Sequence, residues 1–150
     1  MKFTNSLIKG KLLKRYKRFF ADIKVNSKII TAHCPNTGSM QGLLDEGNEV
    51  LVTEHNDPKR KLKFTLEIIK AKKRYVGVNT HRANKIVNHG LENKLISEFK
   101  TIKNIKPEFK FSDDTRFDFL CDDNLIEVKN VTLFRENDIA EFPDAVTSRG

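Results

Sequence analysis

Short apolar stretches alternate with turn-forming clusters in the first half of the chain. The stretches are rich in β-branched, leucine and aromatic residues, and clusters of Asn, Asp, Gly and Pro separate them. This pattern predicts strands at Leu12–Phe20, Lys28–Ala32, Glu49–Thr53, Leu62–Ile69 and Tyr75–Val78. So many short strands in so little chain favour a small antiparallel barrel of the OB type, whose open groove commonly binds single strands of nucleic acid.

The second half begins with a helical pattern and continues with strands. A helix is predicted from His89 or Gly90 to about Lys103, because Leu91, Leu95, Ile96 and Phe99 fall on one helical face. Three strands are predicted after it, at Glu108–Phe111, Arg116–Cys121 and Leu125–Thr132. We therefore expect a helix followed by a three-strand meander.

Charge divides the chain at about the same place. The 150 residues carry a formal net charge of +8, but the balance is uneven. Residues 1–82 hold 18 basic and 7 acidic side chains, whereas residues 83–150 hold 10 basic and 13 acidic ones. This shift predicts two domains, 1–82 and 83–150. The basic first part favours an anionic partner, most often nucleic acid and less often a membrane surface.

Other features of the sequence exclude several classes of protein. No apolar run is long enough for a signal-peptide core or for the roughly 18 to 20 residues that span a bilayer. We therefore expect a cytoplasmic protein with no membrane partner. Cys34 and Cys121 lie far apart and are expected to be buried, reduced thiols. No nucleotide-binding loop, haem motif or sugar-binding pattern is present, and nothing indicates a protein partner or oligomeric state.

One segment combines cations with aromatic rings. Its residues Lys14, Arg15, Tyr16, Lys17 and Arg18, followed by Phe19 and Phe20, carry the two chemistries that bind phosphates and stack on bases. We predict a nucleic-acid contact surface there, which Arg60, Lys61 and Lys63 could extend. The alternative is that the rings pack inward and the cations are merely solvated.

The segment His33–Met40 gathers an imidazole, a thiol and a hydroxyl in one turn. Adjacent His33 and Cys34 on a strand would point to opposite faces, which makes them a poor base and nucleophile pair. We interpret the segment as a structural turn in which small residues allow close backbone approach.

Two predicted strands of the second half concentrate the acidic chemistry. Asp118 would face away from Phe117 and Phe119, and Glu127 and Lys129 share a face of the next strand. A short turn would bring Asp118 and Glu127 together, and Glu108 could join them. Paired carboxylates favour Mg²⁺ or Mn²⁺, and a nearby ammonium can neutralise charge on a phosphate. The pattern indicates a PD-(D/E)xK nuclease site with catalytic Asp118, Glu127 and Lys129 and with Asp118 and Glu127 as metal ligands. The alternative is a surface ion pair.

Several motifs, in order along nearly the whole chain, resemble the sugar fermentation stimulation protein A (SfsA) family. They comprise residues 14–22 (KRYKRFFAD), 33–40 (HCPNTGSM), 60–62 (RKL), 77–80 (GVNT), 116–119 (RFDF), 127–133 (EVKNVTL) and 142–150 (FPDAVTSRG). The resemblance implies an amino-terminal OB-fold domain, a carboxy-terminal nuclease-like α/β domain, and so an α+β or mixed fold class. Asp118, Glu127 and Lys129 match the nuclease-like triad, and Asp144 lies in a family signature. Because members usually continue past this Ser-Arg-Gly, we expect the second domain to be truncated.

The resemblance also implies a function. Family membership implies DNA binding without sequence specificity and a proposed regulatory role in sugar (maltose) metabolism. A Mg²⁺-dependent nuclease is the alternative, since the triad is intact in sequence, although a fold with the right residues does not establish turnover. A third possibility is a module for single-stranded DNA or RNA in which only the barrel acts.

Overall fold

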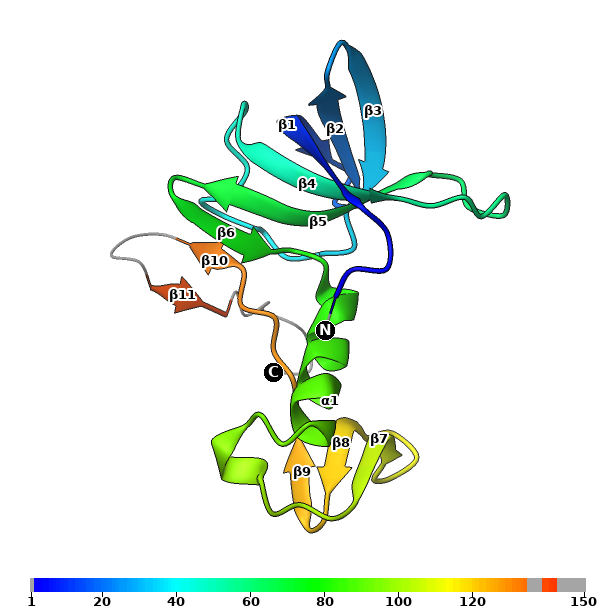
Figure 1. Cartoon of the computed structure of the whole chain (residues 1–150), viewed down its shortest axis with the longest axis vertical. Helices are drawn as coiled ribbons and strands as arrows, with labels where there is room; N and C mark the ends of the chain where they lie inside the picture. Colours follow the sequence, from blue (N-terminus) through cyan, green and yellow to red (C-terminus); the bar gives the residue numbers. More distant parts are fainter. Residues whose placement is uncertain (1, 135–138, 143–150) are drawn as a thin grey trace. The chain divides into compact units, whose positions relative to one another are not determined.

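The computed structural model describes residues 2–134 and 139–142. The chain divides into two compact units, which are described separately. The first unit contains residues 2–80 and the described residues after Lys129, and the second contains residues 81–129. Figure 1 labels their helices and strands.

Five strands of the first unit close into a barrel (Figure 1). The order β3-β2-β1-β4-β5 is antiparallel throughout, and a parallel pairing of β3 with β5 closes it. This connectivity is that of an OB-like barrel, so the fold class predicted from the sequence is confirmed. A sixth strand, β6, pairs with β5 outside the closure. The bounds are β1 Leu7–Tyr16, β2 Phe20–Val25, β3 Lys28–His33, β4 Glu49–Glu54, β5 Phe64–Ala71 and β6 Arg74–Gly77.

Alternating side chains fill the barrel interior. Val50 and Val52 on β4 are fully buried, as are Leu66 and Ile69 on β5. A register shift in the β4–β5 pairing lets both buried pairs face the core. Gly10 on β1 is required by close packing, since a Cβ there would lie 2.6 Å from Ile23 Cγ2. The barrel is thus a conventional packed core inside a closed sheet.

The predicted strand Leu12–Phe20 is wrong, because the chain reverses within it. β1 ends at Tyr16, and β2 begins at Phe20 after a turn. The turn has no Gly, Asn or Pro to mark it; instead Lys17 and Arg18 adopt left-handed φ angles of 48° and 63°. Charged residues alternate with apolar residues in both strands that flank this turn, which leaves too few apolar residues to indicate a strand. The prediction therefore missed the beginning of β1 and most of β2.

The second unit consists of a helix and a three-stranded antiparallel sheet, so the predicted helix followed by a meander is confirmed. The sheet order is β7-β8-β9. Helix α1 packs on the sheet through Leu91, which shares a small core with Phe119 and Cys121. The bounds are α1 Ala83–Glu92, β7 Ile105–Lys110, β8 Arg116–Cys121 and β9 Asn124–Ile126, with short 3₁₀ turns at Thr80–Arg82 and Ser97–Phe99.

The helix was predicted too late in the chain. It begins at Ala83 and ends at Glu92, and Lys94 turns left-handed with a φ of 55°. Polar residues of the first turns hid its start, and Leu95, expected on the apolar face, is 68% exposed beyond its end. No helix within the described residues combines the length and apolar content needed to cross a membrane.

The predicted strand Leu125–Thr132 is also too long. β9 ends at Ile126, and the chain then runs without strand structure as far as Thr132. Buried Thr132 accepts a hydrogen bond from Asn36 Nδ2 at 3.3 Å, so this segment packs within the first unit. A two-stranded pair follows, β10 Leu133–Phe134 with β11 Ala140–Glu141. Cys34 and Cys121 are buried free thiols, as predicted.

Candidate functional site

Aromatic rings and cations gather at the hairpin of β1 and β2. Tyr16 and Phe20 face each other across the strands, and their rings stack with centroids 5.5 Å apart. Lys14 Nζ lies 5.4 Å from the centre of the Tyr16 ring and 3.7 Å from Asp22 Oδ2. Because Ala21 points into the core, Tyr16 and Phe20 lie on the outer face of the barrel, half-buried.

The turn of this hairpin presents two further cations. Lys17 and Arg18 are exposed, and Phe19 beside them is 44% exposed. Left-handed backbone is uncommon for long side chains, and here it reverses the chain without a glycine. We define the hairpin surface as Lys14, Tyr16, Lys17, Arg18 and Phe20.

Arg15 differs from its neighbours in what it binds. Its guanidinium donates from Nε to the Arg18 carbonyl at 3.1 Å and from Nη2 to the Asn36 carbonyl at 2.7 Å. The bond to Arg18 lies within the hairpin, and the bond to Asn36 attaches the hairpin to the segment after β3. Arg15 therefore positions the hairpin, while exposed Lys17 and Arg18 present their charges to solvent and Lys14 pairs with Asp22.

The segment after β3 is built as a structural turn. Cys34 and Met40 are fully buried with their sulfur atoms 3.7 Å apart, and Asn36 Oδ1 accepts a hydrogen bond from the Gly38 amide. His33 is half-buried on the outer face of β3, whereas Cys34 is in the core. The thiol is thus inside the protein with no access for a substrate.

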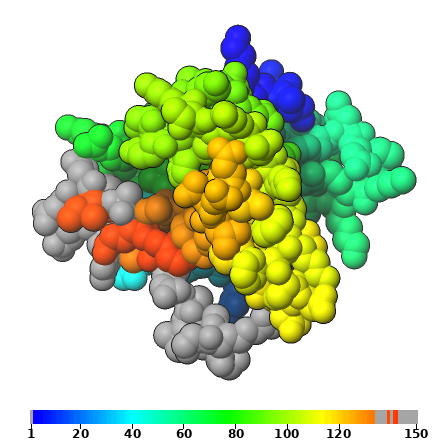
Figure 2. Space-filling model, turned by 90° about the horizontal axis from the view of Figure 1, so that it is seen from below, coloured from blue at the N-terminus to red at the C-terminus, as the bar shows by residue number. Residues whose placement is uncertain are grey.

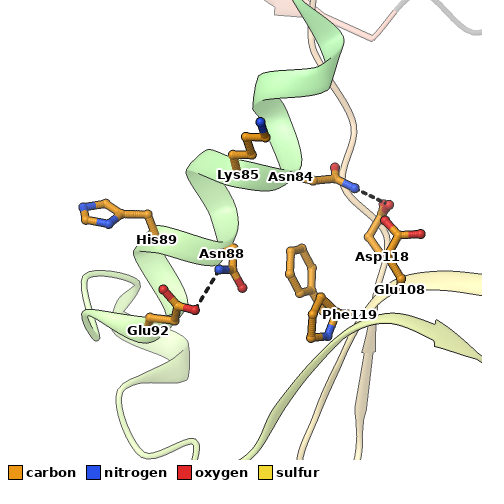
Figure 3. Close-up of a pocket in the computed structure, with 9 residues that line it drawn as sticks. Asn84, Lys85, Asn88, His89, Glu92, Glu108, Asp118 and Phe119 are labelled. Carbon is orange, nitrogen blue, oxygen red and sulfur yellow. Dashed lines mark hydrogen bonds between the residues drawn. The ribbon is translucent and has the colours of Figure 1, made fainter. Parts of the chain in front are cut away.

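Asp118 on β8 is held by two donors within the second unit. Asn84 Nδ2 on α1 donates to Oδ1 at 2.6 Å, and the backbone N–H of Val128 donates to Oδ2 at 2.7 Å. Figure 3 shows Asn84 and Asp118 pointing toward one another. Sequence reasoning missed Asn84, because the predicted helix began after it and no local pattern marks a residue that acts across the fold.

A cavity of about 360 Å³ lies beside Asp118 (Figure 3). Glu108 lines it with Asp118 and adopts a φ of 51° within β7, between two residues that pair regularly with β8. Such a kink re-aims a strand side chain. The lining residues are Asn84, Lys85, Asn88, His89, Glu92, Pro107, Glu108, Asp118 and Phe119.

Glu127 and Lys129 follow β9 and form an ion pair. Lys129 Nζ lies 2.9 Å from Glu127 Oε1, and the two side chains are 51% and 47% exposed respectively. In Figure 2 the part of the chain around and after β9, in orange, is exposed on the face in view. The pairing of Phe119 with Ile126, continued by one residue, would set Asp118 beside Glu127, but β9 ends at Ile126.

The carboxylates offer only part of a metal site. Among the described residues, no group of three or more His, Cys, Asp or Glu side chains is arranged to hold a metal ion. Each carboxylate oxygen of Asp118 accepts one hydrogen bond, from Asn84 or from the Val128 amide, and can accept another. Glu127 accepts a hydrogen bond from Lys129 through Oε1. Two carboxylates suit a cation that keeps several waters, as Mg²⁺ does. Asp144 lies outside the described residues.

Family models match nearly the whole chain. Residues 13–78 match the model described as the SfsA N-terminal OB domain, and residues 81–150 match the sugar fermentation stimulation protein RE domain. The chain belongs to the sugar fermentation stimulation protein (SfsA) family.

Curated members of the SfsA family are similar over the full chain. A sugar fermentation stimulation protein homolog of Pelagibacter ubique is 66% identical over 154 residues, which cover 100% of this chain and 66% of that protein. The homolog of Alteromonas mediterranea is 46% identical, with coverage of 100% and 68%. The chain thus spans about two thirds of the length of these SfsA relatives.

A solved SfsA structure has the same fold. The structure of Pyrococcus furiosus SfsA in complex with Ca²⁺ superposes with a TM-score of 0.80 at 22% sequence identity. The match covers 99% of this chain and 64% of that one. The barrel and the second sheet with its helix are therefore an SfsA fold.

Proposed function

We propose that this SfsA family member binds DNA without sequence specificity through the hairpin surface of its barrel. The observation that carries the proposal is the stacked Tyr16 and Phe20 pair, beside Lys14 and a turn that presents Lys17 and Arg18 in left-handed backbone. Cations bind phosphates whatever the base sequence, and rings stack on any base. A regulatory role in sugar metabolism, maltose included, is the physiological setting that the family suggests.

The test compares two double variants of the full chain that lose the same charge. Lys17→Gln with Arg18→Gln should weaken DNA binding and lower the slope of log affinity against log salt by about 2, since each lost phosphate contact removes roughly one unit. Lys24→Gln with Lys28→Gln, two exposed cations elsewhere on the barrel, is the control and should change both little. Fluorescence anisotropy with a labelled duplex at several salt concentrations measures the slope.

Two results would contradict this proposal. Equal losses in both double variants would mean that binding follows the net charge of the barrel and not the hairpin surface. Absence of binding by the unmodified chain at low salt would reject DNA binding altogether.

A second candidate function is metal-dependent cleavage of phosphodiester bonds. It is favoured by Asp118, whose carboxylate is fixed by Asn84 and the Val128 amide. Glu127 and Lys129 flank Val128 in the chain and form an ion pair. The Ca²⁺ in the Pyrococcus furiosus structure is, like Mg²⁺, an ion that takes oxygen ligands. Asp118 and Glu127 would hold Mg²⁺ or Mn²⁺, which when bound acts as a Lewis acid on a phosphate. Lys129 would neutralise charge on that phosphate.

Cleavage is tested on gels with single- and double-stranded DNA, in Mg²⁺, Mn²⁺ or EDTA. Under the second candidate function, Glu127→Ala should abolish metal-dependent cleavage while retardation in EDTA stays unchanged, because the hairpin surface is intact. The Lys24 and Lys28 double variant serves as the control and should still cleave. Retardation without cleavage by the unmodified chain would leave DNA binding alone, and cleavage that persists in Glu127→Ala would place the activity elsewhere.

A further inference from the structure

Another cavity lies on the outer face of the barrel, next to the hairpin surface. Its volume is about 270 Å³, and its lining residues are Phe20, His33, Arg60, Lys61 and Leu62. Phe20 starts β2, His33 ends β3, and the other three belong to the loop between β4 and β5. Phe20 pairs with His33 across the strands and stacks on Tyr16, so the cavity continues a row of rings from the hairpin surface.

Arg60 is held as a fixed wall of this cavity. Its Nε donates to the Leu62 carbonyl at 3.3 Å and its Nη2 donates to Thr65 Oγ1 at 2.9 Å. Bonds to the protein at two nitrogens fix the plane of the guanidinium, which can then stack on a flat ring. Thr65 lies in β5 and pairs with His33, so the wall is anchored in the closed sheet.

Lys61 and Leu62 complete the lining and add a cation and an apolar contact. Lys61 is exposed at the rim. The described residues that line the cavity include no carboxylate. A planar, electron-rich ligand attached to a phosphate would meet a phenyl ring, a planar cation and an ammonium, which are the groups that bind unstacked nucleotides.

The size of the cavity narrows the ligand further. At about 270 Å³, just below the range of about 300–1,000 Å³ for small-molecule sites, it has room for one base. A base in a duplex is stacked and paired on both sides and cannot enter such a cavity. An unpaired base of a single strand can enter at a lower cost.

We propose that the cavity of Phe20, His33, Arg60 and Lys61 binds one unpaired base of single-stranded DNA, with Lys61 on a neighbouring phosphate. This inference rests on the proposed DNA binding and adds a preference to it. The cations of the hairpin surface hold the backbone of any DNA, whereas the cavity, which shares Phe20 with that surface, selects single strands. The chain then binds a single strand more tightly than a duplex of equal length.

The experiment measures affinities of the full chain for three probes of equal length: a single-stranded oligonucleotide, the same strand with abasic sites throughout, and a duplex. The unmodified chain should bind the ordinary strand at least about 5-fold more tightly than the abasic strand, as expected when at least one base stacks. Phe20→Leu keeps an apolar side chain but removes the ring, and it should lose most of that ratio. A thermal melt confirms that this variant is folded.

A surface variant guards against a folding defect in Phe20→Leu. Lys61→Ala changes an exposed residue and should weaken binding to the ordinary strand, whereas Lys28→Ala removes the same charge away from the cavity and should not. Equal affinity of the unmodified chain for ordinary and abasic strands would overturn the base cavity while leaving DNA binding intact. Failure to bind any of the three probes would overturn the proposed function itself.

Discussion

The barrel and the helix-bearing unit are stabilised in different ways. Thirteen fully or almost fully buried apolar residues fill the described barrel, and its sheet closes on itself. In the second unit the described core has three buried residues, Leu91, Phe119 and Cys121, with partly buried apolar side chains packed against them, and its sheet has three strands. Polar side chains make specific links there: Asp118 binds Asn84 and the Val128 amide, and Asp122 binds the amides of Lys103 and Asn104.

This difference bears on how each unit can support a site. A closed barrel with a large apolar core is rigid, so a few links such as the two hydrogen bonds of Arg15 are enough to hold rings and cations on its outer face. A thin core gives less support, and a carboxylate on it needs hydrogen bonds to keep its orientation. The polar links of the second unit therefore both stabilise it and fix Asp118.

Among the predicted changes in the stability of the second unit, the largest is expected from Asn84→Ala. The substitution removes a hydrogen bond to a half-buried carboxylate and should lower the stability of the second unit by about 1–3 kcal/mol. Amide hydrogen exchange measured residue by residue should show faster exchange in β7 and β8, and unchanged protection in β4 and β5 of the barrel.

The matched control for that variant is Asn88→Ala, one turn further along α1. Asn88 donates to Glu92 at 2.8 Å in a solvent-exposed hydrogen bond, so its loss should cost only about 0.2–0.5 kcal/mol. Equal effects of the two variants would mean that helix propensity, and not the bond to Asp118, controls the stability of this unit.

A smaller, pH-dependent effect is expected at Asp122. Backbone N–H bonds from Asn104 and Lys103 lower the pKa of its carboxyl below the ordinary value, so the charged form stabilises the fold. Because the folded pKa is the lower one, this stabilisation is complete above about pH 4, the unfolded pKa. It is lost as the pH falls through the folded value.

Asp122→Asn is the variant that isolates this contribution. Asn tolerates the left-handed backbone at this position, where φ is 48°, but cannot carry the charge. Urea unfolding should show the variant less stable than the unmodified chain at pH 6, with the gap closing toward pH 3. A gap that stays constant with pH would assign the effect to the shape of the side chain and not to its charge.

Sequence patterns predicted the type of fold better than its boundaries. The OB-like barrel and the meander were predicted because alternation of apolar residues survives on β4, β5 and β8. The β1–β2 turn was missed, since Lys17 and Arg18 adopt a conformation that local propensity disfavours. The helix was predicted too far along the chain because its first turns carry polar residues, among them Asn84, which binds Asp118 of the sheet.

The sequence also named candidate site residues, and their roles stay predictions. Composition and motif order pointed to Lys14–Arg18 and to Asp118, Glu127 and Lys129, and whether these residues act as predicted stays open to the experiments above. The separate position of Arg15, bonded to two carbonyls, could not be predicted, because residues of the same charge differ only in what the fold places beside them. The same is true of Arg60, whose hydrogen bond to Thr65 holds its side chain beside the cavity.

The sequence alone determined the family, the barrel and the excess of cations on its first half, because these depend on residue types and on their order. Tertiary structure decided which groups meet: Asn84 with Asp118, Phe20 with His33, and Thr132 with Asn36. Those partners are 34, 13 and 96 positions apart in the chain. Local propensity has no information about contacts at that range, which form only when burial of the apolar core sets the path of the backbone.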